Sequence, residues 1–206
     1  MIDIFAFATP NSVKVPIALE ELGLDYKLHS INVRKGEQKG HDFVGLNPNA
    51  KVPVMLDGAL VLTESAAILV YLAEKTGKLL PTTGDGRARV FEQLFFHASG
   101  LGPAFGQAGF FKKQAAEPQP IAIARFEAEA ARTAGVLDAV LGRHAFVAGD
   151  DFTIADIAHF GWMWRRAFAE VDISGLTNLS RWLAEIEARP AVIRAIARVE
   201  ALVPQP

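Results

Sequence analysis

A change in composition near residue 80 is the feature that most constrains how this chain of 206 residues can fold. Before it, short β-type runs alternate with helical runs, whereas after Arg87 helix formers dominate and 25 of the 33 alanines occur. The two parts meet at 79–86 (LLPTTGDG), which is rich in Pro, Gly and Thr and typical of a linker. We therefore expect an α+β fold with domains at 1–80 and 87–206, joined by a linker at 79–86.

Composition excludes several classes of protein. Half of the residues are hydrophobic and 21% are charged, which is typical of a globular chain. The net charge of −2 gives no basic surplus, so we expect no nucleic-acid partner. The absence of cysteine excludes disulfides, thiolate metal sites and a cysteine nucleophile. With no signal-peptide pattern and no apolar run near the roughly 18 residues of a membrane span, we expect no membrane partner and a cytoplasmic location.

The first part predicts a small mixed sheet covered by helices, in the order β-α-β-(short α)-β-β-α. The elements are strands at 2–7, 26–33, 52–56 and 59–62, with helices at 11–22 and 64–75. Asn11 is expected as the N-cap of the first helix and Gly23 as its end. Pro16 predicts a kink or a late start in that helix. Asp57-Gly58 predicts a tight hairpin, and the first β-α-β a parallel pair of strands.

The second part predicts only helices. We expect them near 86–112, 119–142, 153–169, 176–188 and 190–200, with glycines around Gly100 and Gly102 bending the first. Thr153 and Asp156 form a capping-box pattern, with a hydrophobic staple between Phe152 and Ile157. We interpret this motif as structural and assign it no catalytic role.

Val52-Pro53 is the first candidate for a binding function, because a proline cannot donate to the hydrogen-bond ladder of a sheet. One interpretation is a cis Val52–Pro53 bond in a turn that leaves the main-chain groups of Val52 free to pair with an extended, peptide-like ligand. The other is a proline on an edge strand. Spacing alone leaves both open.

Glu64-Ser65 is the second candidate. The residues stand at the start of a predicted helix, where free N–H groups and the Ser65 hydroxyl suit a carboxylate and Glu64 suits an ammonium group. Plain helix capping explains the same residues.

Thr9, Asn11 and Ser12 form the third candidate, at the carboxyl end of the first strand. Ligands favour this position in open α/β sheets, and such donors would stabilise a thiolate. Turn and cap chemistry is the alternative. The five histidines show no metal-binding spacing, so we expect no metal site.

These motifs together resemble the cytosolic glutathione S-transferase superfamily, over essentially the whole chain. Val52-Pro53 resembles the family's cis-proline turn, Glu64-Ser65 its γ-glutamyl-binding pair, and the segment 152–156 its C-terminal capping motif. Finer motifs resemble the bacterial nu class and its fungal nitrogen-regulator-like relatives: Thr9-Pro10-Asn11, 19–23 (LEELG), 35–38 (KGEQ), 47–53 (NPNAKVP) and 100–103 (GLGP).

The resemblance implies a thioredoxin-like N-terminal domain followed by an all-helical bundle. It also implies roles for single residues. Thr9 and Asn11 would be catalytic and face the sulfur of glutathione. The implied glutathione-binding residues are Gln38 and Lys51 for the glycyl carboxylate, Val52 with Pro53 for the cysteinyl unit, Glu64 and Ser65 for the γ-glutamyl end, and Arg132.

The resemblance further implies glutathione as co-substrate, bound as two molecules or as glutathione disulfide, and disulfide reduction as the reaction. The second substrate would be a small disulfide, a peroxide or an electrophile, and the protein would be a homodimer. Two alternatives remain: conjugation of glutathione to electrophiles, and a non-catalytic glutathione-binding regulatory module. Phe105, Phe110 and Phe111 would line the second-substrate site or belong to the core.

Overall fold

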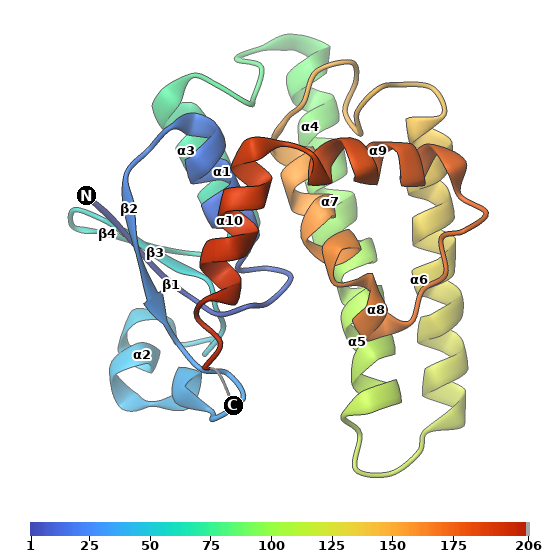
Figure 1. Cartoon of the computed structure of the whole chain (residues 1–206), viewed down its shortest axis with the longest axis horizontal. Helices are drawn as coiled ribbons and strands as arrows, with labels where there is room; N and C mark the ends of the chain where they lie inside the picture. Colours follow the sequence, from blue (N-terminus) through green and yellow to red (C-terminus); the bar gives the residue numbers. More distant parts are fainter. Residues whose placement is uncertain (205–206) are drawn as a thin grey trace. The chain divides into compact units, whose positions relative to one another are not determined.

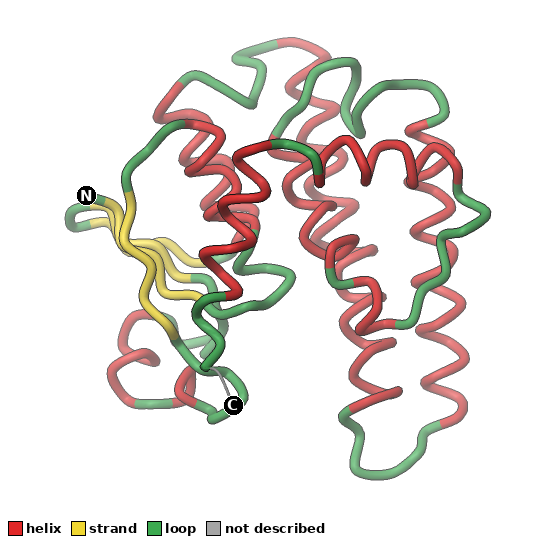
Figure 2. The backbone as a smooth tube through the Cα atoms, in the orientation of Figure 1, coloured by secondary structure: helices red, strands yellow, loops and turns green. Residues whose placement is uncertain are grey.

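The structure, a computed structural model that describes residues 1–204, contains two compact units. One unit combines Met1–Lys78 with the C-terminal segment from Ala188, and the other is Leu79–Glu187. The four-stranded sheet belongs to the first unit, and the second is built from helices (Figure 1 and Figure 2). The predicted α+β class is therefore confirmed, whereas the predicted domain boundaries stay a prediction.

The sheet has the predicted mixed topology. Its strands are β1 (Ile2–Ala6), β2 (Tyr26–Ser30), β3 (Val54–Asp57) and β4 (Leu60–Thr63), in the order β2-β1-β3-β4. β1 pairs in parallel with β2 and antiparallel with β3, and β3 pairs antiparallel with β4. Strand β2 ends at Ser30 rather than at Val33, because the Asn32 side chain accepts hydrogen bonds from two following N–H groups and forms a turn.

The hairpin turn lies one residue later than the sequence predicts. Asp57 pairs with Leu60, so the two turn residues are Gly58 and Ala59. Gly58 has a φ of 62° in the first of these positions, where a primed hairpin turn requires a positive value. The segment before β3 forms η1 (Glu37–Lys39) and α2 (His41–Leu46), which is the expected short helical connection.

Helix α1 (Lys14–Leu22) starts later than predicted. Its N-cap is Val13, so the prediction that Asn11 caps it is wrong. The late start places Pro16 third in the helix, within the first turn, where an N–H has no partner inside the helix. Gly23 ends the helix with left-handed backbone, as predicted.

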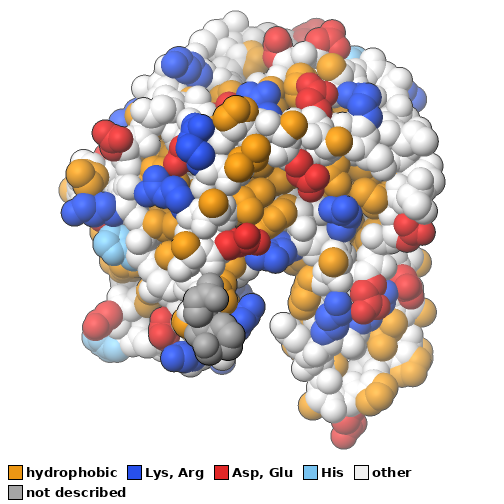
Figure 3. All heavy atoms as spheres, viewed as in Figure 1, with side chains coloured by type: hydrophobic (Ala, Val, Ile, Leu, Met, Phe, Trp, Pro, Cys, Tyr) orange, Lys and Arg blue, Asp and Glu red, His pale blue; other side chains and the backbone are white. Residues whose placement is uncertain are grey.

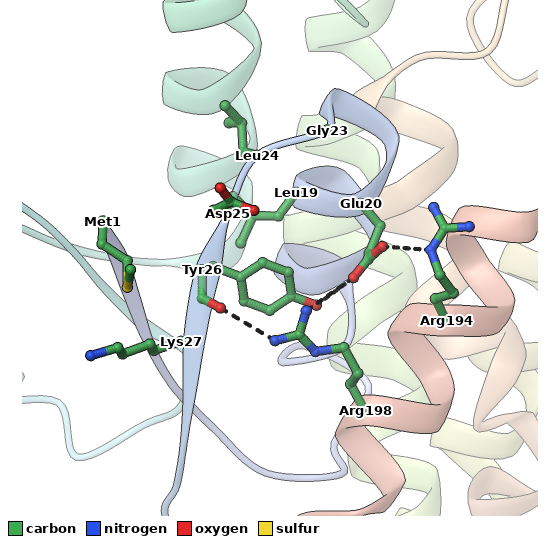
Figure 4. Close-up of a pocket in the computed structure, with 10 residues that line it drawn as sticks. All are labelled: Met1, Leu19, Glu20, Gly23, Leu24, Asp25, Tyr26, Lys27, Arg194 and Arg198. Atoms are coloured by element: carbon green, nitrogen blue, oxygen red, sulfur yellow. Dashed lines mark hydrogen bonds and ion pairs between the residues drawn. The ribbon is translucent and has the colours of Figure 1, made fainter.

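Helix α10 (Pro190–Glu200), from the end of the chain, packs against α1. Figure 4 shows three side chains converging on Glu20 of α1: Arg194 at 2.7 Å, Arg198 at 3.2 Å and the Tyr26 hydroxyl at 3.1 Å. Burial raises the pKa of Glu20, but these hydrogen bonds outweigh it and hold the pKa below its usual value. Arg189 makes a bidentate pair with Glu21. Ion pairs thus add to the apolar packing between α10 and α1 within the first unit.

The second unit contains more breaks than the sequence predicts. Its helices are α4 (Gly84–Phe96), α5 (Gly102–Lys113), α6 (Pro120–Leu141), α7 (Ile154–Trp164), α8 (Arg166–Ala169) and α9 (Thr177–Glu187). A π-helical turn, η2 (His97–Leu101), divides the expected helix 86–112, and Arg165 divides the expected helix 153–169. At Gly102 a Cβ atom would lie 3.1 Å from the His97 carbonyl oxygen and 3.2 Å from Trp162 Nε1, so a side chain there would require these neighbours to shift by a few tenths of an ångström.

The capping box at the start of α7 is confirmed. The Thr153 side chain accepts from the Ala155 N–H, and Asp156 accepts from the Thr153 N–H at 2.9 Å.

On the face drawn in Figure 3, positive and negative side chains are interspersed. None of the helices that the structure describes has both the length and the apolar composition of a membrane span.

Candidate functional site

A cavity of about 270 Å³ in the first unit brings most of the predicted site residues together. Its lining comprises Asn11, Asn47, Lys51, Val52, Pro53, Glu64 and Ser65. Six of these residues are the predicted ones, and they come from the loop before α1, the loop before β3 and the start of α3 (Ser65–Thr76). Three segments that lie apart in the sequence thus line one cavity.

The first turn of α3 supplies one end of the cavity. Ser65 is the first residue of this helix of 12 residues, so N–H groups without partners inside the helix lie beside its hydroxyl. Glu64 precedes it with a φ of 65° and a ψ of 112°, a conformation that L residues rarely adopt. Such strain concentrates at functional sites, and here it accompanies two polar side chains at the cavity wall.

The loop before β3 supplies the opposite wall. The Val52–Pro53 peptide bond is cis, as one of the two interpretations of the sequence requires, whereas the pairing of Val52 with a ligand stays a prediction. The buried Asn47 side chain stabilises this loop, since it donates to the Lys51 carbonyl oxygen at 2.7 Å and accepts from the Asn49 N–H at 3.0 Å. Asn47 is thus a cavity residue to which the sequence assigned no role.

Thr9 and Ser12 are linked to each other in the loop after β1. The Thr9 hydroxyl donates to Ser12 Oγ at 2.9 Å and accepts from the Ser12 N–H at 3.2 Å. Ser12 is fully buried, so its hydroxyl faces the protein interior. Thr9 is half-buried but does not line the cavity, and only Asn11 of the three predicted donors does so.

Lys14, to which the sequence also assigned no role, does not line the cavity but bonds two residues that do. Its Nζ donates to Asn11 Oδ1 at 2.8 Å and to Ser65 Oγ at 3.5 Å, although the residue is only 1% exposed. Burial lowers the pKa of Lys14 to about 7, and the carboxylate of Glu64 partly opposes that shift. A lone charged residue amid the apolar run from Val13 to Leu19 is the signal that could have identified it.

Two predicted binding residues lie outside this cavity lining. Gln38 belongs to η1, and its buried Oε1 has no hydrogen-bond partner in the described part of the chain. Arg132 is on α6 in the other unit, where it pairs with Glu129 through Nε at 2.8 Å and an Nη atom at 2.7 Å. The roles of both residues stay predictions. Within residues 1–204, no three acidic, histidine or cysteine side chains cluster as metal ligands would.

The sheet with its helices has the architecture of a thioredoxin-like domain, and a helical unit accompanies it in the same chain. The family model of the glutathione S-transferase N-terminal domain matches residues 8–75, and that of the C-terminal domain matches residues 103–190. The chain therefore belongs to the glutathione S-transferase family.

Similar proteins cover almost the full length. The disulfide-bond oxidoreductase YfcG of Escherichia coli is 36% identical over an alignment of 209 positions, which covers 97% of this chain and 96% of the relative. One solved structure is that of a glutathione transferase family member from Pseudomonas fluorescens, with two glutathione bound. It is 40% identical to this chain with a TM-score of 0.90, and the match covers 95% of this chain and 92% of the Pseudomonas fluorescens chain. A glutathione transferase from Pseudomonas putida, with one glutathione disulfide per subunit, is 36% identical with a TM-score of 0.89, and covers 95% and 90%.

Proposed function

We propose that this protein binds glutathione or glutathione disulfide in the cavity and catalyses glutathione-dependent disulfide reduction. The observation that carries the proposal is the cavity, which joins the polar start of α3 to the main chain of Val52 in a chain without cysteine. The reacting sulfur must then come from a bound thiol. The two relatives that hold two glutathione molecules or one glutathione disulfide support the same chemistry.

The γ-glutamyl end of glutathione fits the start of α3. Its carboxylate would accept from the Ser65 hydroxyl and from N–H groups of the first helical turn, while Glu64 would pair with its ammonium group. Within residues 1–204 the main-chain N–H and C=O of Val52 enter no hydrogen bond, which leaves both for the cysteinyl unit. Gln38 and Lys51 would serve the glycyl carboxylate, and Arg132 is kept as a further predicted glutathione-binding residue.

The reaction is thiol–disulfide exchange in two steps. The thiolate of one bound glutathione attacks a sulfur of the substrate disulfide, a mixed disulfide forms, and the other substrate sulfur leaves as a thiolate that takes a proton. A second glutathione thiolate then attacks the glutathione sulfur of the mixed disulfide, which yields glutathione disulfide and releases the second substrate thiol. The two glutathione thiols supply both electrons. Asn11 would stabilise the attacking thiolate by donating a hydrogen bond, and Thr9 would do so after its hydroxyl proton turns away from Ser12 Oγ.

The remaining expectations belong to the same proposal. The second substrate is a small disulfide, with peroxides and electrophiles as further acceptors of the same thiolate. The protein acts as a homodimer in the cytoplasm. Conjugation to an electrophile uses the same activated thiolate, so both reactions need to be measured side by side.

Calorimetry with reduced and oxidised glutathione tests binding, and rates with a small disulfide and a chloro-nitro aromatic separate reduction from conjugation. Ser65→Ala should weaken glutathione binding by about 1–3 kcal/mol, because a ligand carboxylate loses a buried donor. Ser30→Ala, at an exposed serine of β2, is the matched control and should bind as the unaltered protein does.

Asn11→Ala should lower turnover of the disulfide by about tenfold or more while changing binding much less, because its amide acts on the developing thiolate. Absence of binding to either form of glutathione would contradict the whole proposal. Tight binding without turnover of disulfide, peroxide or electrophile would instead indicate a regulatory module.

A further inference from the structure

A separate cavity of about 160 Å³, here named the helical-unit cavity, lies within the unit Leu79–Glu187. Its polar wall includes Arg89, Glu92 and Gln93 of α4 and Arg143 of the loop that follows α6. It is smaller than the cavity of about 270 Å³ in the first unit. A ligand of the helical-unit cavity is therefore expected to be smaller than a tripeptide.

Two guanidinium groups at this cavity have no protein partner. Those of Arg89 and Arg143 make no hydrogen bond or ion pair within residues 1–204. The cavity drawn in Figure 4 also contains two arginines, but there Arg194 and Arg198 both bond to Glu20. An unpaired guanidinium keeps its N–H donors available and stays charged at any physiological pH. Two such groups at one cavity favour an anion with several acceptor oxygens.

Gln93 is a buried polar side chain in the wall of the same cavity. The residue is 8% exposed, and its Oε1 has no hydrogen-bond partner in the described part of the chain. A buried carbonyl oxygen without a partner lowers the free energy of unfolding, so packing does not explain the choice of glutamine here. The terminal torsion of a glutamine is soft, and no protein group holds this amide in place. A molecule in the cavity would supply the missing partner.

Glu92 adds a carboxylate to this wall, and that carboxylate has no cationic partner among residues 1–204. A carboxylate repels a fully ionised anion but accepts a hydrogen bond from a ligand hydroxyl. The cavity thus combines two charged donors with two acceptors, the Glu92 carboxylate and the Gln93 carbonyl oxygen. Hydrogen phosphate matches both sets, because it carries ionised oxygens and one O–H group. Sulfate has no proton at neutral pH and matches only the donors.

We propose that the helical-unit cavity is a binding site for hydrogen phosphate. The guanidinium groups of Arg89 and Arg143 bind its ionised oxygens, and Glu92 accepts from its hydroxyl together with the Gln93 carboxamide. His144, which also lines the cavity, offers a further ring nitrogen. A phosphate monoester fits less well, because it loses its last proton near pH 6 and then has no hydroxyl. The proposal is independent of glutathione binding, since none of these residues lines the first cavity.

Calorimetry of the full chain at pH 7.5 and low ionic strength, with inorganic phosphate and with sulfate as separate probes, tests the site. We expect phosphate to bind about tenfold more tightly than sulfate. Arg143→Gln should weaken phosphate binding by about tenfold, because one charged donor is lost. Arg125→Gln, at an exposed arginine of α6 outside the cavity lining, is the matched control and should bind as the unaltered protein does. Weak binding of both anions that Arg143→Gln leaves unchanged would mean an adventitious ion only and would overturn the proposal.

Glu92→Gln tests how the anion is recognised. The substitution removes the repulsion of a fully ionised anion and supplies an amide donor, so sulfate should bind more tightly. Phosphate should gain less, because its hydroxyl loses a charged acceptor. The preference for phosphate over sulfate should therefore fall by at least about threefold. If the preference stays the same in Glu92→Gln, the hydroxyl is not what the cavity recognises and the assignment to hydrogen phosphate is wrong.

Discussion

Lys14 shows at the scale of one residue how a buried ammonium group can oppose stability. In the folded protein burial lowers its pKa from 10.5 to about 7, while in the unfolded chain the pKa stays near the ordinary value. Between these pH values the unfolded chain binds more protons, so this group makes the free energy of unfolding rise as pH rises from about 7 toward 10.5. At pH values below about 7, Lys14 is charged in both the folded and the unfolded state, so the burial of its charge lowers the free energy of unfolding by the full amount.

Lys14→Met should therefore stabilise the protein at pH 7 in the absence of ligand, by roughly 1–3 kcal/mol, because the buried charge is removed and the volume is kept. The variant should also lose the rise in stability between neutral and alkaline pH. Urea unfolding at pH 7 and at about pH 9 measures both effects, with Lys27→Met as the control. A Lys14→Met protein that is less stable at pH 7 would show that the amine supports the fold.

At the scale of an element, α7 illustrates a helix whose start is set by its own sequence. Asp156 accepts from the N–H groups of Thr153 and Val147, from the Thr153 hydroxyl and from Trp182 Nε1. Burial raises the pKa of Asp156 to about 6 despite these four donors. The cap is therefore part of a buried network that ties α7 to α9.

Thr153→Ala should lower the free energy of unfolding by about 1–2 kcal/mol, because the N–H of Ala155 and the carboxylate of Asp156 each lose a partner. Thr83→Ala is the matched control. Thr83 is also a threonine at an N-cap, of α4, but its side chain makes no capping hydrogen bond. Its removal should change stability by at most about 0.5 kcal/mol. Equal losses in the two variants would contradict the role given to the Thr153 side chain.

The elements also show how far the sequence could predict this structure. The end of α1 at Gly23 and the capping box of α7 are local signals, and both are confirmed. The start of α1 is not local, since the Asn11 side chain that would cap it instead binds Lys14. The π-helical turn η2 is followed by Gly102, which lies close to Trp162, and no short motif encodes this tertiary contact. Six of the seven residues that line the cavity were predicted, and the seventh is Asn47, whose hydrogen bonds lie within its own loop. Lys14, outside that lining, reaches Ser65 through a tertiary contact that the sequence does not reveal.

At the scale of the whole molecule, the order of the chain and the grouping of its contacts differ. α10 follows the helices of the second unit in sequence, yet it packs with α1 in the first unit. Its buried face consists of Ala191, Val192, Ala195 and Val199, which lie three or four residues apart or adjacent along one side of the helix. The site-bearing unit is thus completed by the last helix of the chain. The sequence predicted the helix near 190–200 but neither its buried face nor the unit that buries it.

Val192→Asp should therefore lower the stability of the first unit, although Val192 does not line the cavity. Val192 is fully buried, so an aspartate there would be unpaired in an apolar interface and would destabilise the packing of α10 by about 3–5 kcal/mol. Ile193, the next residue, is 55% exposed, and Ile193→Asp is the matched control with an expected change of at most about 0.5 kcal/mol. Hydrogen exchange should show faster exchange of the β1 and α1 amides in Val192→Asp only, together with weaker glutathione binding. If the β1 and α1 amides of that variant exchange as slowly as those of the unaltered protein, then the first unit is stable without the packing of α10, and the prediction is wrong.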